Sequence, residues 1–197
     1  MNRRRSIRPT GLFILLMALL LSGCNRNPNG GISAGTGGFP GPSTQPAEIS
    51  SSSEVVKVET VSIQIPEGES ADAIVRLTIL SGYHVNANPA TYPYLIPTAI
   101  EGAPRPDGFC ATVGKPIYPA GSKTKFDFAE EPLAVYEGTI EIKVPLRLPK
   151  KSEAGCNSYP TKGTRGSLPI KTTIQACDHE KCFPPANIDA TVPVEVN

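Results

Sequence analysis

Apolar and polar residues alternate in the stretch TIEIKVPLRL, residues 139–148. A period of two puts every second side chain on the same face of an extended strand, so one face is buried and the other is polar. The same alternation is found in VKVETVSIQI (56–65) and AIVRLTIL (73–80), and again at residues 168–176 and 188–196. The pattern therefore predicts β-strands at each of these positions.

Turn-forming residues separate these strands. Pro66-Glu67-Gly68 follows the first strand and Ser81-Gly82 follows the second, while no window shows a useful helical period. Short strands with turns between them are typical of an all-β fold, and we predict an immunoglobulin-like antiparallel β-sandwich. Residues 88–121 and 149–167 are predicted to be long loops, which in a compact domain are usually functional or held by a cross-link.

The N-terminal residues 1–23 are predicted to be a lipoprotein signal peptide. Four arginines in the first ten residues precede an apolar run at 12–21, which is about half the length needed to cross a bilayer. The run ends in LSGC (21–24), which resembles a lipobox, although an ordinary secretory signal is the alternative. We expect lipid on Cys24, with several acyl chains such as palmitate anchoring the protein to a bacterial membrane.

Residues 24–53 are predicted to be the lipidated cysteine and a flexible tether rich in Gly, Pro and Ser, and residues 54–197 one domain of about 144 residues. Without the signal peptide, 15 Lys and Arg face 18 Asp and Glu, a net charge of −3. No nucleic-acid partner is implied by this charge. Asn25, rather than Asp, follows Cys24, which favours the periplasmic side of an outer membrane.

Four cysteines remain besides the lipidated one: Cys110, Cys156, Cys177 and Cys182. An even number in an exported protein suggests two disulfides, with three possible pairings. A tight hairpin would place Cys177 and Cys182 on facing strands with Cα atoms about 4.5 to 5.5 Å apart. Cys110 would then pair with Cys156 as a structural link between the two long loops.

The two bridges are expected to differ in their contribution to stability. On the chain-entropy model the small loop contributes about 2 kcal/mol and the large one about 4 kcal/mol. The small bridge is therefore the better candidate for reversible redox chemistry, although many such bridges are inert. Cys177, His179 and Cys182 are also possible metal ligands, but an oxidising compartment favours the disulfide, and we expect no metal and no cofactor.

The segment QACDHEKCFPP (175–185) resembles the signature of the N-terminal periplasmic domain of the thiol:disulfide interchange protein DsbD. GYHVN (82–86), KFDF (125–128) and AVYEG (134–138) are similar to that family's pattern in the same order. The resemblance covers most of residues 55–196 and is strongest at the cysteine pair. It implies an immunoglobulin-like sandwich whose cysteine pair carries electrons from a thioredoxin-like domain to periplasmic disulfide isomerases or related proteins.

By motif position, the resemblance implies that Cys182 forms the mixed disulfide with a partner and that Cys177 resolves it. It also implies that Phe126 or Phe128 caps the pair, with Asp127 as a nearby proton-handling group. The transmembrane and terminal thioredoxin-like domains of the interchange protein have no counterpart in this sequence. We therefore expect an exchange relay supplied with electrons by another protein, rather than a self-contained turnover enzyme.

Two hypotheses follow for the function of the chain. The first is extracytoplasmic thiol:disulfide interchange, in which Cys177 and Cys182 relay electrons between thioredoxin-like partners. The alternative is a non-catalytic surface-binding β-sandwich lipoprotein with two structural disulfides. With His84 and His179 as the only histidines and no Ser-His-acid motif or phosphate-binding glycine loop, a hydrolase is not expected.

Overall fold

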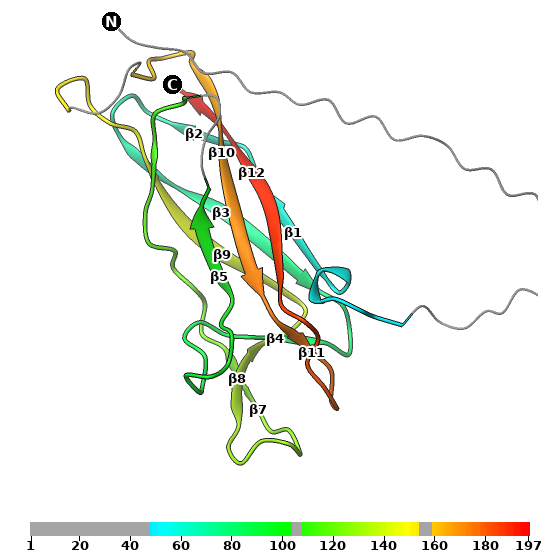
Figure 1. The fold of residues 1–197 in the computed structure, drawn as a ribbon. Coiled ribbons are helices and arrows are strands. Elements are labelled where there is room, and N and C mark those ends of the chain that lie inside the picture. Colours follow the sequence, from blue (N-terminus) through cyan, green and yellow to red (C-terminus); the bar gives the residue numbers. More distant parts are fainter. Residues whose placement is uncertain (1–47, 104–107, 154–158) are drawn as a thin grey trace, which may run out of the picture. The chain divides into compact units, whose positions relative to one another are not determined.

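The computed structural model describes residues 48–103, 108–153 and 159–197. Within these ranges there are twelve strands and one 3-10 helix (Figure 1). The strands form three four-stranded sheets with the orders β1-β3-β9-β6, β2-β12-β10-β5 and β11-β4-β8-β7. Of the strand pairings, β2 with β12 is parallel and the others are antiparallel. The elements are η1 (Ser52–Glu54), β1 (Val56–Thr60), β2 (Ile63–Ile65), β3 (Ser70–Ile79), β4 (His84–Asn86), β5 (Ala99–Gly102), β6 (Thr112–Val113), β7 (Ser122–Thr124), β8 (Leu133–Tyr136), β9 (Thr139–Arg147), β10 (Arg165–Ile174), β11 (Ala176–Cys177) and β12 (Ala186–Val196).

The first two sheets bury their apolar faces against each other in one hydrophobic core. The alternating residues of β3 and β9 supply one side, and those of β10 and β12 supply the other. Figure 1 shows β10 and β12 as a layer lying over β3 and β9. The fully buried side chains include Val75, Leu77, Ile142, Val144, Leu146, Leu168, Ile170 and Val192. The predicted all-β class with antiparallel sheets is confirmed.

The third sheet lies at one end of the domain and carries the cysteine segment. Its strands have two to four residues, so they are too short to show an alternating pattern in the sequence. β4 follows β3 through a turn in which Gly82 has φ of 88°, a conformation that favours glycine. β3 of the first sheet is thus followed by β4, and β10 of the second sheet is followed almost directly by β11. Both large sheets are therefore connected to the small third sheet.

The single strand predicted at 56–65 is in fact two strands in different sheets. β1 pairs with β3, whereas β2 pairs with β12, and the chain changes sheets at Val61 and Ser62. Val61 is 54% exposed at this crossing. Two polar residues in a row, Glu59 and Thr60, shift the apolar positions from even to odd numbers just before this change, so the sequence did carry a sign of the break.

The two predicted loops contain regular structure. Between residues 88 and 121, β5 pairs with β10 and β6 pairs with β9, so this stretch is only partly irregular. Between residues 149 and 167, β10 already begins at Arg165. Both errors have the same cause, since short edge strands and strand ends carry too few residues for a period to be recognised.

Residues just before position 54 pack against the domain. Ser52 is fully buried in η1, and its hydroxyl donates to the Pro184 carbonyl (2.8 Å) and accepts from the Ala176 amide (2.8 Å). The predicted signal peptide, the lipidation site Cys24 and Cys156 lie outside the described residues. Within the part of the chain that the structure describes, no helix is long and apolar enough to span a membrane.

Candidate functional site

Cys177 and Cys182 form a disulfide at the end of β11. β11 pairs with β4 on one side, and Cys177 makes an isolated antiparallel bridge with Cys182 on the other. The predicted pairing on facing segments is therefore confirmed, with a Cα–Cα distance of 3.9 Å, shorter than the expected range. The predicted pair of Cys110 with Cys156 stays a prediction.

The turn between the two cysteines is organised by Asp178. Its carboxylate accepts hydrogen bonds from the backbone amides of Glu180 and Lys181, both at 2.8 Å. Its own amide donates to the Lys181 carbonyl, and the Phe183 amide donates to that of Ala176. The two bonds to the carboxylate, the one from Lys181 first, hold the pKa of Asp178 below its ordinary value. The carboxylate therefore stabilises the turn and is a poor proton acceptor.

The two cysteines differ strongly in accessibility. Cys177 is 2% exposed, whereas Cys182 is an exposed residue. Thiol–disulfide exchange requires the attacking thiolate to reach one sulfur of the disulfide. In this geometry an incoming thiolate can reach Cys182, and Cys177 is then the sulfur released into the interior.

His84 is the neighbour of Cys177 on the other strand. The two residues are directly paired between β4 and β11, and His84 is 3% exposed. Burial lowers the pKa of His84 to about 4, assisted by the nearby His179 and opposed by Asp178. The imidazole is therefore neutral near pH 7, at a position beside the disulfide.

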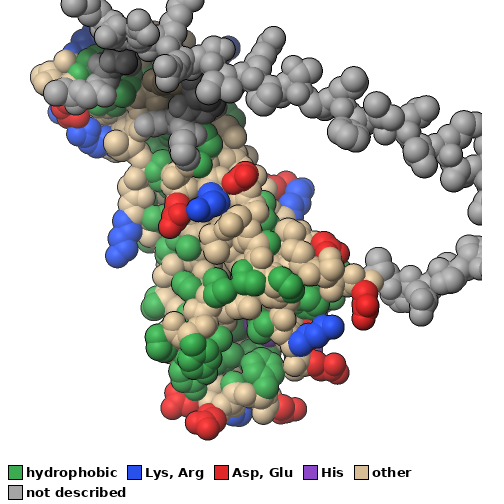
Figure 2. Space-filling model, viewed as in Figure 1, with side chains coloured by type: hydrophobic (Ala, Val, Ile, Leu, Met, Phe, Trp, Pro, Cys, Tyr) green, Lys and Arg blue, Asp and Glu red, His purple; other side chains and the backbone are tan. Residues whose placement is uncertain are grey.

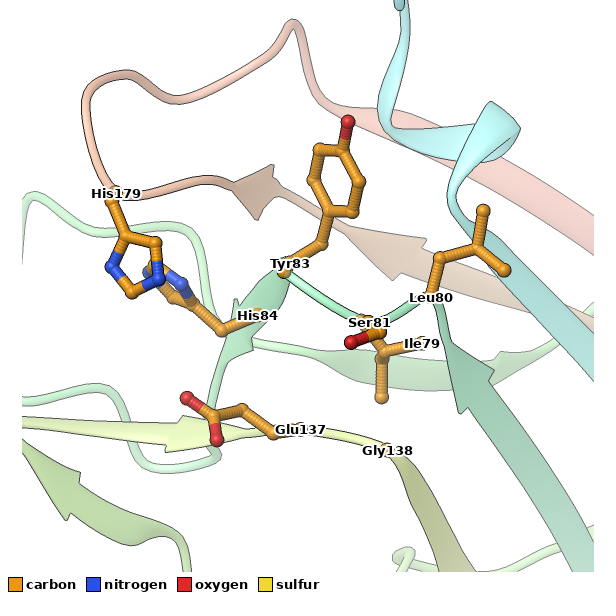
Figure 3. A pocket seen from close by; sticks show the side chains of 9 residues that line it. Ile79, Leu80, Ser81, Tyr83, His84, Glu137, Gly138 and His179 are labelled. Atoms are coloured by element: carbon orange, nitrogen blue, oxygen red, sulfur yellow. The ribbon is translucent and has the colours of Figure 1, made fainter.

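A pocket of about 400 Å³ opens next to this histidine. It is lined by the β3–β4 turn, by the residues after β8 and by His179 of the cysteine turn. Figure 3 shows His84 and His179 together on one side of the pocket, with Leu80 and Tyr83 on the other and the Glu137 carboxylate below the histidines. The pocket gives solvent access to the histidine side of the cysteine pair.

Phe126 covers His84. Their rings are stacked with centroids 4.2 Å apart, and the Phe126 ring also lies 6.2 Å from that of His179. Phe126 is 3% exposed, whereas Phe128 is 52% exposed and stacks on Phe126 at 5.3 Å. Of the two predicted cap residues, Phe126 is thus the one placed against the neighbours of the cysteine pair. Asp127 is exposed between them.

A second pocket, of about 540 Å³, lies beyond the cap and has aromatic walls. Tyr92 and Tyr94, with ring centroids 5.2 Å apart, line it together with Leu95, Phe128 and Leu133. Tyr94 is 76% exposed. Figure 2 shows hydrophobic side chains gathered on this end of the domain, with acidic side chains at its tip. We refer to this pocket as the aromatic groove.

Sequence reasoning missed His84 and the aromatic groove. The sequence shows His84 as one of two histidines and as part of the GYHVN motif, but its place beside Cys177 depends on the strand register. Tyr92 and Tyr94 fall in the stretch predicted to be a long loop, and only the fold brings them against Phe128. The HVN of residues 84–86 within the family-like GYHVN motif was the one signal that could have pointed to this histidine.

No protein-family model matches the chain, and no curated protein matches it. Among solved structures, the chain is similar to the crystal structure of the Neisseria meningitidis DsbD N-terminal domain in the reduced form, with a TM-score of 0.42 and 15% sequence identity. The similarity covers 72% of this chain and 87% of that chain.

Proposed function

We propose that this chain is an exported thiol:disulfide interchange protein that relays electrons between thioredoxin-like partners through Cys177 and Cys182. In this proposal, lipid on Cys24 anchors the protein and residues 24–53 hold the domain away from the membrane, on the periplasmic side of an outer membrane where a cell has two. The partners are then proteins that are themselves exported or displayed at a membrane.

The observation that carries the proposal is the unequal burial of the two cysteines. A partner thiolate attacks the exposed Cys182, a mixed disulfide forms, and the bond to Cys177 breaks, releasing a thiolate. The second thiol of the same partner then attacks the mixed disulfide, so the partner leaves oxidised and Cys177 and Cys182 are both reduced. To pass on its electrons, Cys182 attacks the disulfide of a second partner, and Cys177 restores the original bridge.

Phe126 acts as the cap in this scheme. It lies over His84 and belongs to a small cluster with Leu133 and Val135, separate from the main core. A side chain in a small satellite cluster is easier to displace than one in the central core. Docking of a partner would move Phe126 aside and uncover His84 and the buried Cys177 side of the pair.

Covalent trapping tests the proposal. In Cys177→Ser the exposed thiol of Cys182 attacks a partner disulfide, and the adduct persists because the resolving cysteine is gone. We expect thioredoxin-fold proteins in adducts recovered from a cell-envelope extract. Cys182→Ser is the matched control, because the buried Cys177 should trap at least tenfold less. Equal trapping by both variants, or none by either, would contradict the proposal.

The aromatic groove favours a second candidate function, a non-catalytic binding surface. Pockets of 300 to 1,000 Å³ with apolar walls are typical of ligand sites, and Tyr94 and Phe128 are exposed without a covering element in the described residues. For a binder, Cys177→Ala combined with Cys182→Ala should lose stability and retain partner binding. For the relay, the same double variant should lose covalent exchange entirely.

A further inference from the structure

In the proposed exchange, Cys177 must become a thiolate inside the domain. The thiolate and not the thiol is the nucleophile that resolves a mixed disulfide on Cys182. Cys177 is 2% exposed, and a thiol in apolar surroundings ionises reluctantly because the anion is poorly solvated there. Resolution at a useful rate therefore calls for a proton acceptor beside this sulfur.

Several titratable groups lie around the buried cysteine, but one fits this role. The Asp178 carboxylate accepts two backbone hydrogen bonds in the turn, and Asp127 and His179 are exposed. Glu137 lines the pocket but is also exposed and is not paired with Cys177. His84 is buried and is paired directly with the cysteine across two strands.

The strand register determines how close the two side chains lie. Residues directly opposite in an antiparallel pair share a face of the sheet and have Cβ atoms about 4.5 to 5.5 Å apart. His84 and Cys177 are such a pair, while Cys182 flanks Cys177 on the other side. The imidazole is held by stacking under Phe126 and also lines the 400 Å³ pocket, through which its proton can exchange with water.

We propose that His84 accepts the proton of the Cys177 thiol as Cys177 attacks the mixed disulfide on Cys182. This inference rests on the proposed thiol–disulfide exchange. The bond between Cys177 and Cys182 forms, the bond from Cys182 to the partner sulfur breaks, and the partner leaves as a thiolate. That thiolate takes up the proton from the His84 imidazolium or from water, so the cysteine pair loses two electrons and the partner gains them.

The same burial explains why His84 does not carry a charge in the oxidised protein. With the disulfide closed, an isolated imidazolium next to the apolar cap is unfavourable, which is the cause of its lowered pKa. When Cys177 ionises, the thiolate supplies the missing counter-charge at the neighbouring position. The proton then moves between two states. In one, the thiol and the imidazole are both neutral; in the other, a thiolate lies beside an imidazolium.

Oxidation of the reduced protein by glutathione disulfide tests this role. Attack by Cys182 gives a glutathione adduct, and attack by Cys177 then releases glutathione, so acid quenching and mass spectrometry give both rates. In His84→Gln we expect the second rate to fall at least tenfold near pH 7 and to rise steeply with pH, as in the loss of a general base. Adduct formation should change less than twofold. The matched control is Asp189→Asn in β12, which changes an exposed carboxylate outside the pocket and should leave both rates unchanged.

The outcomes separate this inference from the proposed function. Unchanged resolution in His84→Gln, with an unchanged pH profile, would overturn the role of His84 while leaving the relay intact. If the wild-type protein never resolves the adduct, or never forms it, the relay itself fails.

A second measurement leaves His84 in place. In the reduced wild-type protein, the ¹⁵N shifts of the His84 ring should titrate together with the thiolate absorbance of Cys177. In Cys177→Ser this shared titration should vanish. A His84 titration that is the same in both proteins would refute the proton exchange.

Discussion

Lowering the pH should weaken the oxidised fold through His84. The pKa of this imidazole is lowered from 6.5 to about 4, chiefly by burial. The unfolded chain therefore binds a proton as the pH falls through about 6.5, while the folded chain does so only near 4. Between these values unfolding takes up a proton, so the free energy of unfolding decreases as the pH decreases, and below about 4 this contribution is constant.

The size of the effect follows from the same shift. A difference of one pKa unit corresponds to about 1.4 kcal/mol, so the shift at His84 is worth up to about 3 kcal/mol between neutral and acidic pH. The contribution to stability is smaller than this limit, because the side of the imidazole that lines the pocket can be hydrated. Carboxylates such as Asp178, whose pKa is also lowered, add their own loss of stability on acidification, so a single protein cannot isolate the histidine.

Urea unfolding of the wild-type protein and of His84→Gln at about pH 7, 5.5 and 4 separates the two contributions. Glutamine does not titrate, so the variant should lose less stability on acidification than the wild type, by about 2 to 3 kcal/mol. If His84→Gln loses as much stability as the wild type between pH 7 and 4, the assignment of a buried neutral imidazole is wrong.

Three further substitutions test the packing around the site. Phe126→Ala should reduce stability by about 2 to 4 kcal/mol and speed reduction of the disulfide by dithiothreitol several-fold, because a 3% exposed ring is removed beside the pair; an unchanged reduction rate would count against the cap. Ser52→Ala should cost about 1 to 3 kcal/mol in urea unfolding, since it removes two hydrogen bonds of a buried hydroxyl, whereas the exposed Ser53→Ala should cost less than about 0.5 kcal/mol. Gly166→Ala should destabilise by about 1 to 3 kcal/mol, because a Cβ there meets the ring of Phe109; a melting temperature equal to that of the wild type would contradict this close approach.

The long strands were predictable because their residues alternate over eight or more positions. The stretch at 139–148 predicts β9 to within one residue, and the one at 73–80 predicts most of β3. The alternation at 56–65 changes phase at Glu59 and Thr60, just before the change from β1 to β2, so the prediction of one strand there was wrong. A pattern of buried and exposed faces records which side of a sheet a residue occupies, and it does not record which sheet.

Only part of the candidate site could be predicted from the sequence. The disulfide between Cys177 and Cys182 was predictable, because a five-residue separation in a hairpin leaves little choice of partner. The burial of Cys177 and its pairing with His84 depend on the register between two short strands that are nearly 100 residues apart in the chain. Two-residue strands such as β11 carry no recognisable period, so the alternation of apolar and polar residues could not place that histidine beside the sulfur.

The reduction potential of the Cys177–Cys182 bond tests the proposed relay most directly. The protein would be equilibrated in glutathione or dithiothreitol redox buffers, and the reduced fraction measured by thiol alkylation and mass spectrometry. A relay between thioredoxin-like proteins predicts a potential in their range, about −120 to −270 mV. A bond reduced only below about −300 mV would be a structural disulfide and would contradict the account.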